Sequence, residues 1–220
     1  MPCFYDPLRR QIVVNSLKVM QTTLSRQPGL APLSQRRLAR LLVARALSRR
    51  GPRVVGLVRD PLARLVSFFG NKFRSSPRAL LQREASGGER ARFQHCQQIF
   101  FAPLGLASDV PIETGCRALL GASLGDVVRW LPRVFAQDAH LWPQSWSFRV
   151  AGRVRFRADL LLRLEQLDAA ALARELGIDP GERGNPSEAG EAVWLDAAER
   201  AVVARVYAED YARFGYPLQP

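Results

Sequence analysis

The sequence predicts an α/β fold in which helices flank a central parallel sheet. Two runs that read as strands, residues 11–17 and 53–58, are each followed by a loop and then by a helical pattern. An amphipathic helix lies between them, and this order is typical of parallel strands joined by crossover helices. Apolar side chains make up 47% of the 220 residues, enough for one sizeable core, so we expect a single domain over residues 1–220.

The first strand and its helix come from the segment QIVVNSLKVMQTTL. Residues 11–17 form a short β-branched strand, a polar loop follows, and a helix begins near Thr22. Pro28 and Gly29 end that helix. Ser34 then caps the next helix, whose leucines form one apolar stripe while its other face is arginine.

The second strand is RVVGLV at residues 53–58, an apolar run of the kind that is buried in parallel sheets. Asp60 and Pro61 supply an N-cap and a proline in the first turn, which predicts a helix over residues 61–73. Ligands of such sheets bind at the carboxyl ends of the strands. The loops at Lys18 and at Arg59 both follow such ends, so we expect the ligand site there.

The rest of the chain is predicted to be mainly helical. The expected elements are helices and loops over residues 75–114, a helix from Ser123, a strand within 154–167, a helix over 168–176, a loop over 179–191 and a final helix over 196–215.

The composition favours an anionic partner. Thirty-two basic against 20 acidic residues leave a net charge of +12, and only Lys18 and Lys72 among the basic residues are lysines. A nucleic-acid binder is one candidate, with the basic helix over residues 34–50 as its contact. Aromatic residues are not interleaved with these arginines, and no nucleic-acid fold signature is present. We therefore expect a solvated helix face and no nucleic-acid partner.

Cysteine spacing and hydropathy favour a cytoplasmic protein. Cys3, Cys96 and Cys116 are odd in number and show no C-x-x-C spacing, so neither a disulfide framework nor a zinc site is expected. No run of about 18 apolar residues is present, which argues against a membrane span, and no secretory signal precedes the first strand. The oligomeric state stays open.

The segment KVMQTTL has features of a phosphate-binding loop. Lys18 and paired hydroxyls stand beside the free N–H groups of a helix start, where the helix dipole attracts anions. The alternative is that Lys18 is a solvated surface lysine and Thr22 a plain N-cap. The pattern G-x-x-x-x-G-K-[ST] is absent, which disfavours a conventional NTPase or kinase.

The segment VVGLVRDPLARLVSFF is more specific. Arg59 follows the predicted strand, and Ser67 lies two helical turns further along. A planar guanidinium and a hydroxyl together suit a phosphate monoester. The alternative is a plain strand-to-helix turn with a capping Asp60 and an ion pair from Asp60 to Arg64, which does not account for Arg59 or Ser67.

Six segments together resemble the family 2 carbohydrate sulfotransferases. VVGLVRDPLARLVSFFGNKF is similar to the family's 3′-phosphate-binding pattern R-D-P-x-x-R-x-x-S, and KVMQTTL to its 5′-phosphosulfate loop. SLGDVVRWL with DAHLWPQSW, LLRLEQLDAAALARELGI, GNPSE and VYAEDYARFGYP resemble later family segments in the same order. The resemblance spans nearly the whole chain apart from residues 75–114, and it implies a P-loop-like three-layer fold.

The resemblance implies transfer of a sulfuryl group from 3′-phosphoadenosine 5′-phosphosulfate to a hydroxyl of a carbohydrate, glycolipid or other small acceptor. Lys18 would meet the bridging oxygen and the 5′-phosphate, while Arg59 and Ser67 would hold the 3′-phosphate. A fixed cation at the bridging oxygen stabilises the charge that develops there in the transition state, and no metal is required. The remaining donor contacts would come from backbone N–H groups and hydroxyls of Met20, Gln21, Thr22 and Thr23.

The acceptor hydroxyl needs a base, and the chain has only two histidines. His140 matches the histidine of the family pattern H-W-x-P-Q and is our candidate base; the alternative is that it only packs to hold its loop. His95 lies in the unmatched middle and is expected to be structural, with a place facing the acceptor as the alternative. Glu165 and Asp210 match family positions, and we expect structural hydrogen bonds from both.

Two residues of the phosphosulfate loop depart from the family pattern. Met20 stands where the family usually has glycine or another small residue, and Leu17 stands where a proline often precedes the lysine. In a left-handed conformation a methionine costs about 1 kcal/mol or more. The second hypothesis is therefore a degenerate family member that binds a 3′,5′-bisphosphonucleotide without transfer.

Overall fold

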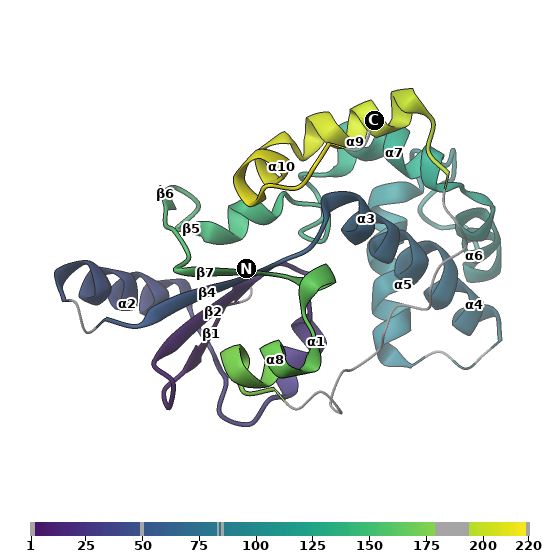
Figure 1. The fold of residues 1–220 in the computed structure, drawn as a ribbon. Helices are drawn as coiled ribbons and strands as arrows, with labels where there is room; N and C mark the ends of the chain where they lie inside the picture. Colours follow the sequence, from purple (N-terminus) through teal and green to yellow (C-terminus); the bar gives the residue numbers. More distant parts are fainter. Residues whose placement is uncertain (1–2, 49–50, 83, 85, 179–193, 219–220) are drawn as a thin grey trace. The chain divides into compact units, whose positions relative to one another are not determined.

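The computed structural model describes residues 3–48, 51–82, 84, 86–178 and 194–218, which fall into two compact units (Figure 1). The first unit comprises Met1–Pro61, Pro143–Pro186 and Glu209–Pro217, and the second comprises Leu62–Trp142, Ser187–Ala208 and Leu218–Pro220. Each unit is therefore built from separate stretches of the sequence. A single domain over residues 1–220 stays a prediction.

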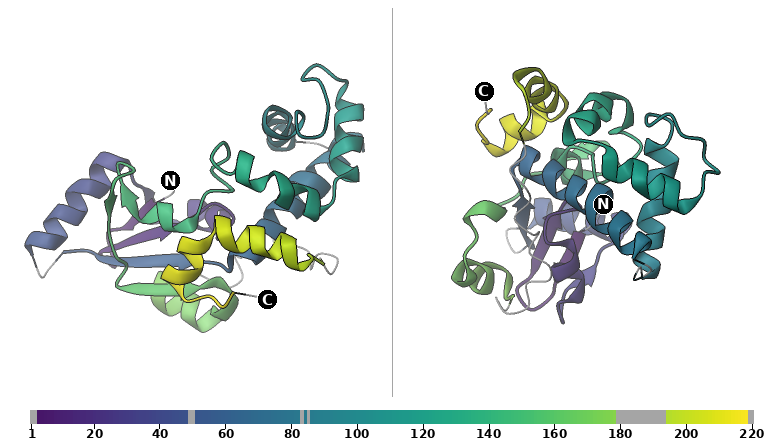
Figure 2. Two further views of the ribbon diagram at one scale, coloured as in Figure 1. Left: turned by 90° about the horizontal axis from the view of Figure 1, so that it is seen from above. Right: turned by 90° about the vertical axis from the view of Figure 1, so that its right-hand side faces the viewer.

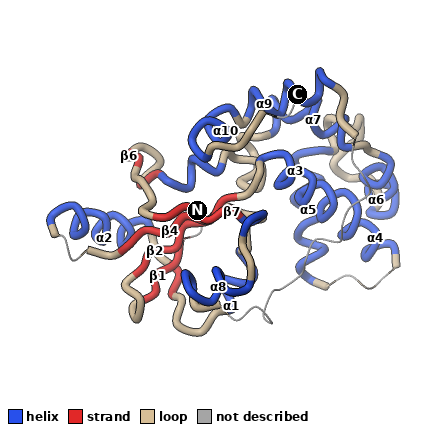
Figure 3. Tube along the Cα trace, viewed as in Figure 1, coloured by secondary structure: helices blue, strands red, loops and turns tan. Residues whose placement is uncertain are grey.

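The first unit contains a mixed five-stranded sheet. The strand order is β3 (Ala31–Pro32), β1 (Cys3–Asp6), β2 (Gln11–Asn15), β4 (Arg53–Val58) and β7 (Leu160–Arg163). β2, β4 and β7 run parallel, whereas β1 is antiparallel to both of its neighbours. The carboxyl ends of the three parallel strands therefore meet at one edge of this sheet, whose strands are red in Figure 3.

Helices cover both faces of this sheet. Three helices cover one face: α2 (Gln35–Leu47), the 3₁₀ helix Gln144–Phe148 and α10 (Ala208–Phe214). They pack on the sheet through their side chains Leu38, Phe148 and Phe214. Two helices, α1 (Gln21–Arg26) and α8 (Ala169–Leu176), cover the other face. Leu24 of α1 and Leu172 and Leu176 of α8 pack on the sheet there. Figures 1 and 2 show α8 and α10 on opposite sides of the strands. Burial from both sides explains why the IVV run of β2 and the VVGLV run of β4 contain no alternating polar residues.

Short elements complete the first unit. β5 (Arg149–Val150) and β6 (Val154–Arg155) form a separate antiparallel pair, and the 3₁₀ helix Leu164–Gln166 follows β7. Phe148 packs so closely on β4 that a Cβ atom at Gly56 would come within 2.7 Å of its ring. The glycine in the RVVGLV run is therefore required by packing against this ring.

The second unit is helical in its described residues. It contains α3 (Pro61–Phe69), a π-helical stretch Gly70–Ser75, α4 (Ser76–Leu81), α5 (Gly87–Phe100), α6 (Ile112–Gly121), α7 (Leu124–Val134) and α9 (Ala197–Val206). Capping boxes begin α5, α7 and α9 and fix where these helices start. The buried rings of Phe68, Phe73 and Phe100 pack with centroids 4.9 to 6.3 Å apart.

Most predicted elements are confirmed. β4 has the predicted bounds, Ser34 caps α2 by accepting a hydrogen bond from the Arg37 N–H at 3.3 Å, and Asp168 caps α8. The predicted helix over residues 61–73 is present as α3 and the π-helical stretch that continues it.

Three other expectations were not fully confirmed or could not be compared with the structure. The predicted central parallel sheet is present as β2, β4 and β7, but β1 and β3 add an antiparallel edge that makes the whole sheet mixed. The single final helix was wrong, because Tyr207, at φ −105° and ψ 22°, separates α9 from α10. The predicted loop over residues 179–191 and the GNPSE segment lie outside the described residues.

Cys3, Cys96 and Cys116 are buried free thiols, and burial raises the pKa of Cys3 and Cys116 to about 11. Their reactive thiolate form is therefore scarce at neutral pH. Among the helices of the described residues, none has both the length and the apolar character needed to cross a membrane.

Candidate active site

The loop between β2 and α1 is folded tightly on a buried asparagine. The Asn15 side-chain amide donates to the Val19 carbonyl and to Gln21 Oε1, each at 2.9 Å. The Val19 N–H in turn donates to the Ser16 carbonyl at 3.2 Å. These bonds hold Lys18 within the turn that leads from the strand into α1.

This turn places two side-chain-bearing residues in the left-handed region of the backbone. Lys18 has φ 69° and Met20 has φ 55° and ψ 18°, with Met20 directly preceding α1. The family's usual glycine at position 20 adopts this conformation without steric cost, whereas the Cβ atom of methionine does not. The departure noted in the sequence therefore falls at a position where the backbone favours glycine.

We expect Met20→Gly to raise the free energy of unfolding relative to Met20→Ala by about 1 kcal/mol, because alanine keeps the Cβ strain at positive φ and glycine removes it. The pair is matched, since both variants lose the contacts that Met20 makes with the apolar cluster under α1. Urea unfolding of the two variants measures the difference. Equal midpoints would show that the left-handed backbone at this position carries no strain.

The other predicted residues of this loop face different surroundings. Gln21 is the first residue of α1, and its side-chain oxygen is used by Asn15. Thr22 is exposed, whereas Thr23 is 4% exposed and belongs to the buried side of α1. The two hydroxyls, which the sequence analysis treated as a pair, therefore differ in access to a ligand.

Arg59 follows β4, and its backbone is fixed by a glutamine from a distant segment. The Gln144 side-chain oxygen accepts from the Arg59 N–H at 2.9 Å, and its amide donates to the Arg59 carbonyl at 2.6 Å. The same oxygen accepts from the Ser16 hydroxyl at 3.3 Å. Fully buried Gln144 thus joins the end of β2 to the end of β4.

Gln144 is itself held by a buried aspartate. The Asp210 carboxylate accepts from the Gln144 N–H at 2.6 Å and from the Ser145 N–H at 2.8 Å, and Asp210 is fully buried. Glu165, after β7, accepts from the Asp60 N–H at 2.8 Å and from the Tyr216 hydroxyl at 3.0 Å. The structural hydrogen bonds expected of Glu165 and Asp210 are confirmed.

The second unit carries Ser67 on α3 and His140 in the loop after α7. Three successive carbonyls of that loop are bound by buried side chains. Arg64, which is 1% exposed, donates to the carbonyls of His140 at 2.8 Å and Trp142 at 2.7 Å. The Tyr207 hydroxyl donates to the Leu141 carbonyl at 2.9 Å, and the Arg64 guanidinium stacks 5.2 Å from the Tyr207 ring centroid. The loop that carries the candidate base is therefore clamped.

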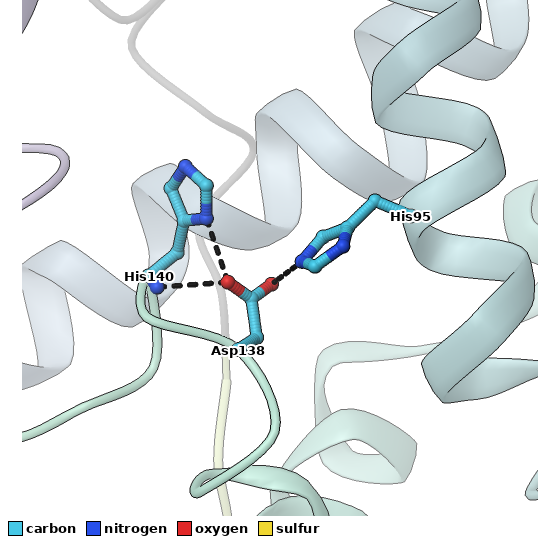
Figure 4. Close-up of side chains that lie close together, drawn as sticks. All are labelled: His95, Asp138 and His140. Carbon is cyan, nitrogen blue, oxygen red and sulfur yellow. Dashed lines mark hydrogen bonds and ion pairs between the residues drawn. The ribbon is translucent and has the colours of Figure 1, made fainter.

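His140 also contacts a carboxylate that the sequence analysis did not single out (Figure 4). Asp138, which is 1% exposed, accepts at Oδ1 from the His140 backbone N–H at 2.8 Å and lies 2.7 Å from His140 Nδ1. Its Oδ2 atom lies 3.1 Å from His95 Nε2. The D-x-H spacing at residues 138–140 was the signal that could have indicated this pairing.

Opposing effects act on the pKa of Asp138. Burial raises the pKa, but the hydrogen bonds from His140 and the charges of His140 and His95 outweigh burial and lower it to about 2. The carboxylate is therefore ionised at neutral pH, where it accepts hydrogen bonds and does not donate them.

Acidification should remove the stability that Asp138 contributes. Its pKa is about 2 when folded, against the ordinary value of 3.8, so this contribution is complete above about pH 5 and is lost as the pH falls toward about 2. The loss amounts to about 2 kcal/mol of the free energy of unfolding. Urea unfolding at several pH values should show a shallower acid dependence in Asp138→Asn, whereas parallel curves for this variant and the wild type would contradict the assignment.

His95, Asp138 and His140 also meet one condition for a metal site. Their donor atoms lie within 4.8 Å of one another, so they are close enough to share an ion. Tetrahedral zinc with bonds of about 2 Å keeps its ligands roughly 3.3 Å apart. The 2.7 Å separation of His140 Nδ1 and Asp138 Oδ1 is instead that of a hydrogen bond, so the group fits a hydrogen-bonded network better.

The turns that carry Lys18 and Arg59 follow neighbouring parallel strands of an α/β sheet, at the carboxyl edge where proteins of this class bind their ligands. The chain belongs to the sulfotransferase family, whose family model matches residues 35–217. This confirms the resemblance to family 2 sulfotransferases and indicates sulfuryl transfer as the chemistry of the fold. The Lys18 loop precedes the matched range. No significant match was found among curated proteins or among solved structures.

Proposed function

We propose that this protein transfers a sulfuryl group from 3′-phosphoadenosine 5′-phosphosulfate to a hydroxyl of a carbohydrate, glycolipid or other small acceptor. The observation that supports this most is the linkage of two strand ends through Gln144. It ties the turn that carries Lys18 to the turn that carries Arg59 within a sulfotransferase-family chain. Two cationic turns fixed at one sheet edge suit a donor with phosphates at both ends of its ribose.

In this proposal the β2–α1 turn binds the 5′ end of the donor in a P-loop-like manner. Lys18 supplies a point charge to the 5′-phosphate and to the bridging oxygen. Backbone N–H groups at Met20 and Gln21 and the exposed Thr22 hydroxyl supply hydrogen bonds, with Thr23 on the buried side of the helix. Arg59 binds the 3′-phosphate, and Ser67 is proposed as its hydroxyl partner.

The reaction forms two bonds, from the acceptor oxygen to sulfur and from the acceptor proton to His140, and it breaks two. The acceptor oxygen bonds to sulfur as the bond from sulfur to the bridging oxygen breaks, and the acceptor proton passes to Nε2 of His140. Negative charge then develops on the bridging oxygen of the departing bisphosphonucleotide, where Lys18 stabilises it more strongly than in the ground state. The products are the sulfate ester, 3′-phosphoadenosine 5′-phosphate and a protonated histidine.

One observation favours the second candidate function. Met20 brings a bulky side chain to the left-handed position where the family usually has glycine. A chain in which this side chain obstructs the phosphosulfate would bind the bisphosphonucleotide without transferring a sulfuryl group. Turnover by Met20→Gly with none by the wild type would identify this case.

The first test is isothermal titration with 3′-phosphoadenosine 5′-phosphate. We expect a Kd of about micromolar order for the wild type and at least a roughly tenfold weaker Kd for Arg59→Ala. Arg153→Ala is the matched control, because it removes an exposed arginine from the turn between β5 and β6 of the same unit. No binding by the folded wild type, or equal loss in both variants, would contradict the proposed nucleotide site.

A further inference from the structure

Asp138 is a buried carboxylate placed between the only two histidines of the chain. We propose that Asp138 is a positioning residue for His140: it holds the imidazole with the proton on Nδ1 and leaves Nε2 free to take the acceptor proton. His95 contacts the second carboxylate oxygen. The inference rests on the proposed function, in which His140 is the base.

The tautomer follows from the hydrogen bond. Asp138 Oδ1 lies 2.7 Å from His140 Nδ1, and an ionised carboxylate can only accept, so the ring nitrogen carries the proton. In neutral imidazole the other nitrogen then has a free lone pair. Figure 4 shows Nε2 on the side of the ring away from Asp138. The orientation is that required of a general base held by a carboxylate.

The ring has little freedom to turn away from this arrangement. The His140 backbone N–H donates to the same Oδ1 atom at 2.8 Å, which anchors both the backbone and the ring of one residue to one oxygen. Arg64 holds the His140 carbonyl, and the Phe68 ring packs with its centroid 6.3 Å from that of His140. The contacts to the His140 backbone and to the His140 ring therefore hold this imidazole in place before an acceptor binds.

His95 stabilises the carboxylate from another element. It lies on α5, its Nε2 atom is 3.1 Å from Asp138 Oδ2, and the centroids of the two imidazoles are 6.3 Å apart. Oδ2 is buried, and the His95 ring nitrogen beside it reduces the cost of burying the carboxylate. His95 therefore acts on His140 through Asp138 rather than on a substrate.

Nitrogen-15 spectra of the imidazole rings test this directly, because two histidines give two assignable ring systems and His95→Gln separates them. We expect the neutral ring of wild-type His140 to carry its proton on Nδ1, with Nε2 unprotonated. Asp138→Asn and Asp138→Ala should shift His140 toward the other tautomer or a mixture. A tautomer mixture in the wild type, or an unchanged Nδ1–H form in Asp138→Ala, would overturn the proposal. This measurement does not require enzyme activity. It can therefore fail or succeed independently of the proposed sulfotransferase function.

Kinetics supply the second readout. With any accepted hydroxyl compound, Asp138→Asn should lower kcat by roughly tenfold or more with little change in the donor KM, as expected for a group that orients the base without touching substrate. Glu113→Gln, at an exposed carboxylate of α6, is the matched control. A purely structural role would lower kcat only together with loss of fold, measured by circular dichroism. One tightly bound zinc ion per wild-type chain, absent from Asp138→Asn, would overturn the proposal in favour of a metal site.

Discussion

Replacing Lys18 by alanine should lower kcat by about 10² to 10³-fold, the effect of removing one group that stabilises developing charge in a transition state. Charge accumulates on the bridging oxygen only as the sulfur–oxygen bond breaks, so the lysine contributes more to the transition state than to binding. The Kd for 3′-phosphoadenosine 5′-phosphate should therefore weaken much less than kcat falls. Release of this nucleotide from the phosphosulfate donor in the presence of an accepted hydroxyl compound measures the rate.

The matched control for Lys18→Ala is Arg26→Ala. Arg26 is an exposed basic residue in the last turn of α1, so its loss removes the same formal charge from the helix that directly follows the Lys18 turn. We expect this variant to turn over at the wild-type rate. Normal turnover by Lys18→Ala, or an equal decrease in both variants, would show that Lys18 does not act at the reacting bond.

The second large effect is expected on stability, in the clamp around the His140 loop. Arg64→Met keeps most of the apolar stem but leaves the carbonyls of His140 and Trp142 without their charged donors. Hydrogen bonds from a charged group are worth about 1.5 to 3 kcal/mol each, so we expect the free energy of unfolding to fall by about 3 kcal/mol or more. Urea unfolding followed by circular dichroism measures the loss.

Two further variants make the Arg64 result interpretable. Tyr207→Phe removes only the neutral hydrogen bond to the Leu141 carbonyl and should cost about 1 kcal/mol. Arg117→Met removes an exposed arginine that pairs with Glu113 along α6 and should change stability by less than about 0.5 kcal/mol. A loss in Arg64→Met no larger than in Arg117→Met would contradict the clamp. Where Arg64→Met does not fold, Arg64→Lys gives the graded comparison.

Local signals explain which parts of the fold could be predicted. β4 was predicted at its observed bounds because a continuous apolar run between Pro52 and the Asp60–Pro61 turn has few alternatives to a buried strand. α2 and α8 were predicted because Ser34 and Asp168 mark their starts. Such signals lie within a few residues of the element that they define. They can therefore be recognised in the sequence without knowledge of tertiary contacts.

Elements stabilised by distant partners were missed. β1 has only four residues, too few to show a period, and it is stabilised by pairing with β2 and β3. The break at Tyr207 has no local marker such as glycine or proline. In the structure the hydroxyl of this residue donates to the Leu141 carbonyl, and its ring lies against the Arg64 guanidinium. The periodicity of apolar residues in the sequence does not indicate either contact.

The sequence by itself determined the sulfotransferase family, the succession β2, α1, α2, β4 and α3, and the candidates Lys18, Arg59, Ser67 and His140, because these follow from short motifs and local periodicity. Only the tertiary structure decided that Gln144 joins the ends of β2 and β4, that Arg64 holds the His140 loop, and that Asp138 lies between two histidines. His95 and Asp138 are far apart in sequence, and their contact depends on how α5 packs. Side chains that meet in this way carry no mutual signal along the chain, because their separation is set by packing rather than by backbone periodicity.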